Sequence, residues 1–348
     1  MQAVCFADRL RRTALPPTVA TVRAPVGRLL GPVGGGVKRL AASLLLCSAT
    51  LVSAQAFPER PVQMVVPFGP GGTTDIMARL LADELGRQLG GSVVVINTAG
   101  AGGLIGMGNV ARTKPDGHTI SMTTIGPLTI QPARRDNNSY TPESFDYLCG
   151  TYDVPLMVMV RADSPHKSLV DLMNSVKANP GKFNYGSSGI GGALHIAMLQ
   201  LLRHAGTTGT HVPYRSTGDM IVPLKTGEIE AIVETPPVAA QHQLRPLVAL
   251  SDTPALGFEG VPTAKQLGLP VRGTVWGGLV APKGMPADVR VKLEAACERA
   301  TATTLYKARA QAANSPLAYR DSAGFKRFAL AEFEKFKKLV VENGLQER

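Results

Sequence analysis

The stretch Val62–Arg79, which reads VQMVVPFGPGGTTDIMAR, decides the fold of this chain. Its first five residues, Val62–Val66, form a β-rich run that ends at Pro67 and a turn of glycine and proline. Beyond the turn, apolar residues recur at helical spacing from Ile76 to Leu85. The stretch therefore predicts a strand, a turn and a helix, as found in α/β domains.

The turn Phe68–Gly72 has the chemistry of an anion site. Glycines without Cβ let backbone N–H groups approach a ligand closely, and a helix N-terminus adds partial positive charge. We expect Thr73 or Thr74 to cap the helix, with Asp75 in its first turn. An ordinary connection between strand and helix has the same pattern, so this stretch alone leaves both interpretations open.

The composition fits a globular α/β protein. A chain of 348 residues has room for two domains, and its 37 Gly and 26 Pro supply many turns. The net charge is +11, but the leader of residues 1–56 carries seven basic residues and one acidic residue, which leaves +5 for the rest. The rest has one Trp and no basic run interleaved with aromatic residues, so we expect no nucleic-acid partner.

The leader ends in the pattern of a signal peptide. Lys38–Arg39 precede the apolar run Leu40–Val52, and Ala54–Ala56 offers small residues at the two positions that a signal peptidase reads. We expect the signal peptide to occupy about residues 37–56, with translation beginning near its first residue and cleavage before Phe57. The apolar run is too short to span a membrane, so the sequence predicts a soluble, exported protein.

The cysteines and histidines do not suggest a metal site. Cys5 and Cys47 leave with the leader, so the mature protein keeps Cys149 and Cys297. Two cysteines are too few for a disulfide scaffold, and whether they form one bridge stays open. No pair of cysteines and no close pair of histidines has the spacing of metal ligands, so we expect no metal.

A glycine-rich loop follows the second predicted strand, Val93–Ile96. Gly100, Gly102 and Gly106 almost form a dinucleotide fingerprint, but the third glycine falls one place late. Three residues separate the strand from the first glycine, and no acidic residue ends a strand about 20 residues further on. We therefore expect no nucleotide cofactor.

A second strand, turn and helix occur in the middle of the chain. Phe183–Tyr185 precede the turn Gly186–Gly192, which leads into a helix predicted from Ala193 to His204. This turn resembles Phe68–Gly72 in kind. Two such turns, one in each domain, would enclose an anion between them.

Polar residues also follow the ends of two other strands. Thr124 and Gly126 come at the end of the strand His118–Thr124, where open α/β sheets bind their ligands. Glu234 ends the strand Glu228–Val233 just before two prolines. It either meets an amine or hydroxyl of a ligand or lies in solvent.

Ser187, Ser188 and His195 support an alternative, an exported α/β hydrolase. The sequence GSSG is not the G-x-S-x-G of a nucleophile elbow, and no acidic residue is placed to orient His195. We therefore expect a binding protein without catalysis. For His195, on the first turn of its helix, a ligand contact, a cap and a packed position all stay open.

Motifs along the whole mature chain carry a resemblance to one known family. In order they are Pro67-Phe68-x-x-Gly71-Gly72-x-x-Asp75-x-x-Ala78-Arg79, Gly100-Ala101-Gly102-Gly103 with Ile105-Gly106, Val110-Ala111-Arg112, Pro115-Asp116-Gly117-x-Thr119, Asn184-Tyr185, His195 and His211-Val212-Pro213-Tyr214. Together they resemble the tripartite tricarboxylate transporter substrate-binding receptors, also called the Bug family. Each motif is weak alone, but their order and spacing are specific.

The resemblance implies an α/β protein of the type II-like Venus-flytrap class, with two domains that are each a mixed sheet flanked by helices. Residues 57–155 and 276–348 would form domain 1 and residues 156–275 domain 2, joined by two crossover strands. The interdomain cleft would bind a small carboxylate in the periplasm, either an organic acid, an amino acid or an aromatic acid. The implied partners are membrane transporter subunits or a sensor kinase, and we expect a monomer.

The predicted ligand contacts combine the two turns with the strand ends. They are Phe68, Gly71, Gly72, Thr73, Thr74, Asp75, Thr124, Gly126, Ser187, Ser188, Gly189, His195 and Glu234. Of these, Asp75 is four residues before Arg79 and is expected to pair with it and to shape the turn.

Two departures from the family pattern concern the ligand. Glu234-Thr235 stands where relatives usually have an Asp-Asn pair, which makes the acidic side chain one methylene longer. Gly192-Ala193-Leu194 replaces the usual polar Thr or Ser neighbours of His195. The second departure favours a less polar ligand, and both leave its identity open.

Overall fold

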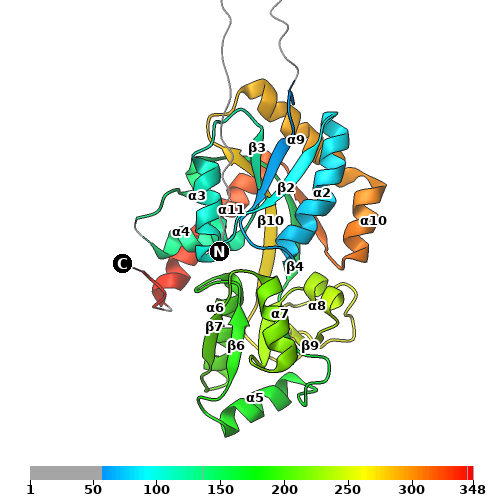
Figure 1. The fold of residues 1–348 in the computed structure, drawn as a ribbon. Coiled ribbons are helices and arrows are strands. Elements are labelled where there is room, and N and C mark those ends of the chain that lie inside the picture. The colour runs from blue at the N-terminus through cyan, green and yellow to red at the C-terminus, as the bar shows by residue number, and fades with distance from the viewer. Residues whose placement is uncertain (1–56, 136, 343, 348) are drawn as a thin grey trace, which may run out of the picture. The chain divides into compact units, whose positions relative to one another are not determined.

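The computed structural model describes residues 57–135, 137–342 and 344–347 (Figure 1). The leader and its predicted signal peptide lie outside these ranges. Within them, no helix combines the length and the apolar character needed to cross a membrane. The chain forms two mixed sheets, each flanked by helices. We refer to each sheet with its helices as a lobe.

The sheet of the first lobe has six strands in the order β11-β4-β10-β3-β1-β2. Strand β1 pairs in parallel with β2 and β3, whereas β10 pairs antiparallel with β3 and β4. Its strands are β1 (Val62–Val66), β2 (Val93–Asn97), β3 (Thr119–Thr124), β4 (Phe145–Pro155), β10 (Thr274–Pro282) and β11 (Leu317–Arg320).

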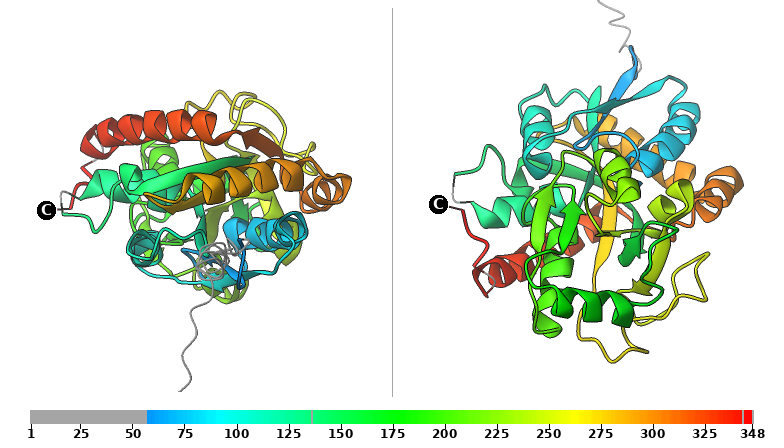
Figure 2. Two further views of the ribbon diagram at one scale, coloured as in Figure 1. Left: turned by 90° about the horizontal axis from the view of Figure 1, so that it is seen from above. Right: turned by 60° about the horizontal axis from the view of Figure 1, so that its bottom comes forward.

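Helices cover both faces of this sheet (Figure 2). Side chains alternate along β1, so Met64 joins one core and Val65 the other. The first core includes residues of α2 (Thr73–Leu89), α9 (Ala287–Ala302) and α10 (Thr304–Ala312). The second core includes residues of α3 (Leu104–Ala111), the π-helical turn η2 (Gly126–Ile130) and α11 (Ser322–Glu342). The remaining elements of the lobe are α4 (Gln131–Arg134) and the 3₁₀ turns η1 (Ala101–Gly103) and η3 (Pro142–Ser144).

The sheet of the second lobe has five strands in the order β7-β6-β8-β5-β9. Here β6 pairs in parallel with β7 and β8, whereas β5 pairs antiparallel with β8 and β9. Its strands are β5 (Met157–Val160), β6 (Asn184–Ser187), β7 (Thr210–Pro213), β8 (Ala231–Glu234) and β9 (Arg245–Ala249). Its helices are α5 (Leu169–Ala178) and α6 (Ala193–His204) on one core, with α7 (Thr217–Thr226) and α8 (Pro236–His242) on the other.

The chain passes between the sheets at two adjacent points. Pro155 pairs with Thr274, and the N–H of Leu156 donates to the carbonyl oxygen of Gly273 at 2.9 Å. This pair of crossings supports the predicted division into residues 57–155 with 276–348 and residues 156–275, which we retain as a proposal.

The opening stretch forms the predicted strand and helix, β1 and α2. The predicted cap is wrong, however, because Gly72 occupies the N-cap position and no side chain caps the helix. Thr73 and Thr74 already lie inside the helix, and their hydroxyls contact Thr235 and Tyr152 instead. The first N–H groups of α2 are therefore left without a side-chain acceptor from the cap.

Cys149 of β4 and Cys297 of α9 form a disulfide, which the sequence had left open. Both residues are fully buried in the first core. The bond links α9 to the long strand β4 within the first lobe.

Candidate functional site

A small cavity of about 60 Å³ lies where the two lobes meet. Loops and helix ends of both lobes line it, including ten of the thirteen predicted ligand contacts. These ten are Phe68, Gly72, Thr73, Thr74, Asp75, Thr124, Gly126, Ser188, Gly189 and Glu234. Gly71, Ser187 and His195 do not line the cavity, and each of them supports a loop beside it.

The N-terminus of α2 forms the first wall of the cavity. Gly72 is the N-cap, and Thr73 and Thr74 of the first turn are buried at the cavity surface. The hydroxyl of Tyr152 donates to Thr74 Oγ1 at 3.1 Å, which holds that side chain against β4. The helix macrodipole and the uncapped N–H groups make this end of α2 favourable for a negative charge.

Asp75 stabilises the turn before α2. Its carboxylate accepts hydrogen bonds from the N–H of Gly71 at 3.1 Å, from Arg79 Nη2 at 2.9 Å and from Asn97 Nδ2 at 2.9 Å. The predicted pairing with Arg79 is confirmed. Because its hydrogen-bonding capacity is largely used within the lobe, Asp75 shapes the turn while its side chain forms part of the cavity wall.

The N-terminus of α6 forms the facing wall. Gly192 is its N-cap, again without a side-chain cap, and Ala193 and Leu194 line the cavity. The preceding loop turns through Gly189 and Gly191, whose φ values of +119° and +64° favour glycine. The two walls therefore present two helix N-termini of different lobes to one cavity.

His195 stabilises the loop before α6. Its Nδ1 accepts a hydrogen bond from the N–H of Gly191 at 2.9 Å, and its ring stacks on His211 with 3.8 Å between centroids. Burial, with the neighbouring His211 and Arg134, lowers the pKa of His195 to about 3. Burial also lowers the pKa of His211 to about 4, so both rings are neutral near pH 7.

The contacts of Ser187 argue against the hydrolase alternative. Its hydroxyl donates to the carbonyl oxygen of Gly189 at 2.9 Å, so its only proton is already used. The neighbouring His211 Nε2, 2.7 Å away, is then the donor to Ser187 Oγ and is unable to act as its base. Within the described ranges, no hydrogen bond joins His195 to Ser187 or Ser188, which removes the pairing that the alternative requires.

Glu234, the last residue of β8, lines the cavity and is only 3% exposed. Thr217 Oγ1, from the first turn of α7, donates to Glu234 Oε1 at 2.5 Å, and the N–H of Thr235 donates to Oε2 at 3.2 Å. Burial raises the pKa of Glu234 to about 7, against the opposing effect of these two hydrogen bonds. The solvent-exposed alternative for this residue is wrong.

Sequence reasoning missed several residues of the cavity wall, among them Gly102, Gln131, Thr217 and Val275. Gly102 belongs to the glycine-rich loop that resembles the family motif, so the motif itself was an available signal. Thr217 follows Ser216, the N-cap of α7, and a search for helix starts would have found it. No sequence signal marks Gln131, which reaches the cavity through the short helix after β3.

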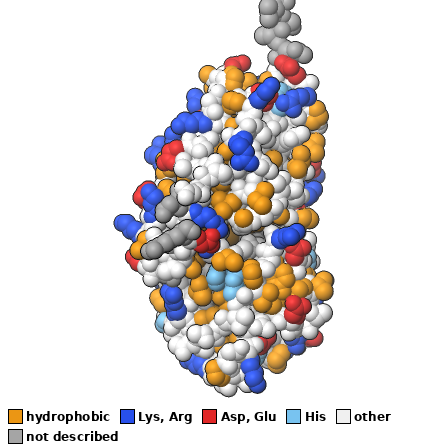
Figure 3. Space-filling model, turned by 60° about the vertical axis from the view of Figure 1, so that its left-hand side comes forward, with side chains coloured by type: hydrophobic (Ala, Val, Ile, Leu, Met, Phe, Trp, Pro, Cys, Tyr) orange, Lys and Arg blue, Asp and Glu red, His pale blue; other side chains and the backbone are white. Residues whose placement is uncertain are grey.

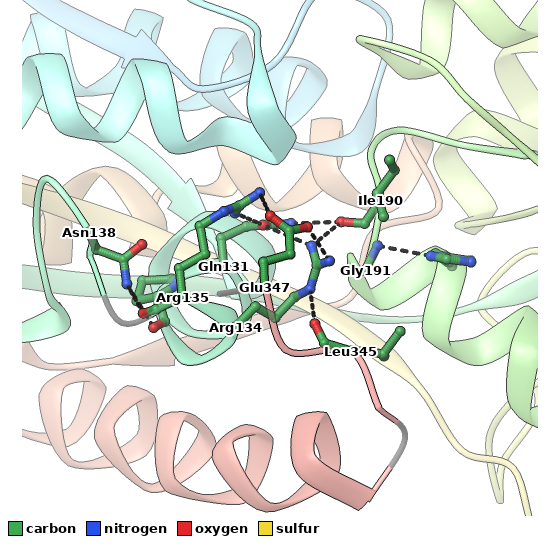
Figure 4. A network of polar contacts seen from close by, with 10 residues as sticks. Gln131, Arg134, Arg135, Asn138, Ile190, Gly191, Leu345 and Glu347 are labelled. Carbon is green, nitrogen blue, oxygen red and sulfur yellow. Dashed lines mark hydrogen bonds and ion pairs between the residues drawn. The ribbon is translucent and has the colours of Figure 1, made fainter.

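A network of polar contacts joins the lobes beside the cavity (Figure 4). Arg134 of the first lobe donates from Nη1 to the carbonyl oxygen of Ile190 in the second lobe at 2.6 Å. It also donates from Nε to the carbonyl oxygen of Leu345 at 2.9 Å and pairs with Glu347. Gln131 Nε2 donates to Ile190 as well, at 3.1 Å, so the loop before α6 is held from the first lobe.

Neither a continuous basic area on the face drawn in Figure 3 nor a cluster of possible metal ligands among the described residues is present. On the face that Figure 3 shows, basic side chains are interspersed with acidic ones and form no continuous basic area. Among the residues that the structure describes, no group of three or more His, Cys, Asp or Glu side chains could hold a metal ion.

Solved structures with this fold define the class of protein. BugD, a periplasmic binding protein, matches with a TM-score of 0.80 and 28% identity over 84% of this chain and 100% of its own. MatC of Rhodopseudomonas palustris, solved with bound malate, matches with a TM-score of 0.76 and 27% identity over 82% and 100%. Rpa4515 of R. palustris, solved with adipate, matches with a TM-score of 0.78 and 25% identity over 83% and 98%. The fold is that of a two-domain periplasmic binding protein.

Sequence comparison defines the family. The family model described as tripartite tricarboxylate transporter family receptor matches residues 77–345. Protein BugT of Bordetella pertussis is 34% identical over 70% of this chain and 77% of its own length. A UPF0065 protein of Cupriavidus necator is 32% identical over 84% of this chain and 90% of its own length. The chain belongs to the tripartite tricarboxylate transporter receptors, the Bug family of solute-binding receptors.

Proposed function

We propose that this protein binds a small carboxylate solute in the cavity between its lobes. The observation that carries the proposal is the meeting of two helix N-termini, those of α2 and α6, at one cavity. Neither has a side-chain cap, and each contributes partial positive charge and free N–H donors to an anion. Receptors of the same fold hold malate and adipate, which supports a carboxylate ligand.

The chemistry of the remaining cavity wall favours a ligand with an apolar body. Phe68, Ile125, Ala193, Leu194 and Val275 supply an apolar surface beside the helix ends. A ligand whose body is apolar would bury surface there and gain from the hydrophobic effect. We propose an organic, amino or aromatic acid of few atoms, because the cavity is small.

The proposed location and partners are supported by the family and by the chain. We propose that the protein works in the periplasm, after removal of its signal peptide, as a monomer. The disulfide between Cys149 and Cys297 supports this location, because disulfides persist in oxidising compartments. The ligand would pass to transporter subunits in the membrane or be reported to a sensor kinase, and no catalytic step is proposed.

A thermal-shift screen of small carboxylates tests the proposed function. A carboxylate present at about 100 times its dissociation constant is expected to stabilise the folded protein by roughly 2.7 kcal/mol. Matched alcohols or amides, which lack the negative charge, are the control and are expected to leave the melting temperature unchanged. If the uncharged analogues raise the melting temperature as much as the acids do, the proposal is overturned.

A further inference from the structure

Glu234 is an acidic side chain in a cavity that we assign to anions. It is buried, it lines the cavity, and it comes from the second lobe while α2 approaches from the first. The hydroxyls of Thr73 and Thr235 are in contact across the same junction, which brings the first turn of α2 next to the residue after Glu234. A ligand held at the end of α2 therefore lies close to the Glu234 carboxyl group.

The charges around the cavity do not compensate an ionised Glu234. Among the described residues that line the cavity, two are acidic and none is Lys, Arg or His. Asp75 is paired with Arg79, but the partners of Glu234 are a hydroxyl and an amide N–H, both neutral. The titratable groups on the surrounding elements include Tyr152 on β4, Asp75 and Arg79 on α2, His195 on α6, Asp219 and Lys225 on α7, and His242 on α8.

Two ligand chemistries could satisfy Glu234. A ligand ammonium group would pair with the ionised carboxylate, because opposite charges compensate each other's desolvation. A ligand without an amine would instead bring a second negative charge into a buried space that holds no free cation among its described lining residues. That ligand is compatible with the cavity only when Glu234 is a neutral acid, whose O–H can donate a hydrogen bond.

The observations favour the neutral acid. Each oxygen of the Glu234 carboxyl group receives one neutral donor, which is less than a buried carboxylate needs. On the basis of the proposed function, we propose that Glu234 determines ligand specificity. The side chain of Glu234 is a neutral carboxylic acid when it contacts a ligand that has no amine. When Glu234 is ionised in the free protein, binding of the ligand anion takes up one proton. The product is the complex with protonated Glu234.

This uptake of a proton makes affinity depend on pH. Burial raises the pKa of Glu234 to about 7 in the ligand-free protein, so the group is mostly protonated below that pH and mostly ionised above it. A folded-state pKa above the ordinary value of 4.5 means that the proton is available at low pH and lost as pH rises through about 7. Affinity for a carboxylate should then fall about tenfold for each pH unit above this value.

The experiment uses four probes at about pH 6 and about pH 8.5. Malate and adipate carry no amine, whereas aspartate and 2-aminoadipate are their close amine-bearing counterparts. Affinities are measured by calorimetry for the wild type, for Glu234→Gln and for Glu228→Gln, an exposed control. Calorimetry in buffers of different ionisation enthalpy gives the protons taken up per ligand.

The expected result is an affinity for malate or adipate about thirtyfold higher at the lower pH, with uptake of one proton at the higher pH. Glu234→Gln, which is neutral at both pH values, should lose this difference, and Glu228→Gln should keep it. Equal affinity at both pH values in the wild type would overturn the proposal. Binding of only the amine-bearing probes, lost in Glu234→Gln, would overturn it too while leaving the carboxylate receptor function intact.

Infrared spectroscopy of the ligand-free protein decides the case in which none of the probes binds. The proposal predicts a carboxylic acid C=O band at about pH 6 that is missing from Glu234→Gln and that disappears at about pH 8.5. A spectrum without this band shows an ionised Glu234 and contradicts the proposal. Failure of the proposed function appears separately, as a lack of stabilisation by every carboxylate in the thermal-shift screen.

Discussion

Two acidic residues line the same cavity, and their contacts give them different roles. Asp75 accepts hydrogen bonds from Gly71, Arg79 and Asn97, so its charge is used within the first lobe. Glu234 has only two neutral donors and no cation in contact with it among the residues described. Asp75 is therefore part of the framework of the first lobe, and Glu234 is the acidic residue for which we propose a role in ligand recognition.

Asp75→Asn is expected to destabilise the fold. The amide would replace a buried carboxylate that accepts hydrogen bonds from the half-buried Gly71 and Asn97 and from the exposed Arg79, at a cost of roughly 2–4 kcal/mol in the free energy of unfolding. Asp83→Asn on the same helix is the control, because its ion pair with Arg309 is exposed and should contribute less than about 1 kcal/mol. Urea denaturation measures both, and equal effects of the two substitutions would contradict the structural role of Asp75.

At this scale the sequence predicted residues that belong to motifs and missed those that depend on packing. Gly72 and Asp75 follow a strand in a recognisable turn, so their position relative to a helix start was readable. Gln131 and Val275 reach the cavity only because distant strands bring them there. Ser187 and His195 were predicted as ligand contacts, but hydrogen bonds within their own loop hold them beside the cavity.

At the scale of elements, the N-terminal ends of α2 and α6 line the candidate site between the two lobes. The sequence predicted α2 and α6 because a glycine turn precedes each helical pattern. It predicted the wrong cap for α2, since threonine is a good N-cap by preference, yet tertiary contacts with Thr235 and Tyr152 use both hydroxyls. Local propensity was overridden by contacts between elements far apart in sequence.

Arg134 is expected to hold the two lobes together. Its planar guanidinium reaches Ile190 of the second lobe and Leu345 of the first at once, which a lysine ammonium cannot do. Arg134→Lys should therefore enlarge the radius of gyration of the ligand-free protein in X-ray scattering. It should also speed ligand release about tenfold, as expected for the loss of one hydrogen bond to a charged group.

Arg135→Lys is the control for this prediction. Arg135 pairs with Gln131 and Glu347, both outside the second lobe, so its replacement should leave the distance between the lobes unchanged. If Arg134→Lys scatters like the wild type and releases ligand at the same rate, the contact with Ile190 does not contribute to closure.

At the scale of the whole molecule, the two crossings and the disulfide organise the chain. The disulfide closes a loop of 148 residues, which contains the entire second sheet. The sequence predicted the two-domain fold through the family resemblance that its motifs carry, because their order and spacing together are specific. It could not decide the cysteine pairing, which depends on the approach of β4 and α9 in the folded first lobe.

Replacing both cysteines by alanine is expected to lower the free energy of unfolding by about 2–5 kcal/mol, because the cross-link restricts the unfolded chain. Reduction of the wild type should lower its melting temperature toward that of the double variant. Carboxylate affinity should change little, since the bond lies in the core of the first lobe and away from the cavity. A melting temperature insensitive to reduction would show that the bond does not stabilise the fold.

The central claim is that a carboxylate binds at the N-terminus of α2, and calorimetry of Gly72→Asp tests it most directly. A Cβ at this N-cap would lie 3.0 Å from Thr217 Oγ1, and the new carboxylate would bring negative charge to the anion site. The carboxylate that stabilises the wild type most in the thermal-shift screen should bind this variant at least tenfold more weakly, about 1.4 kcal/mol. Gly260→Asp, which adds the same charge at an exposed site with open space, should bind it like the wild type. Equal affinity of Gly72→Asp and the wild type would contradict the account.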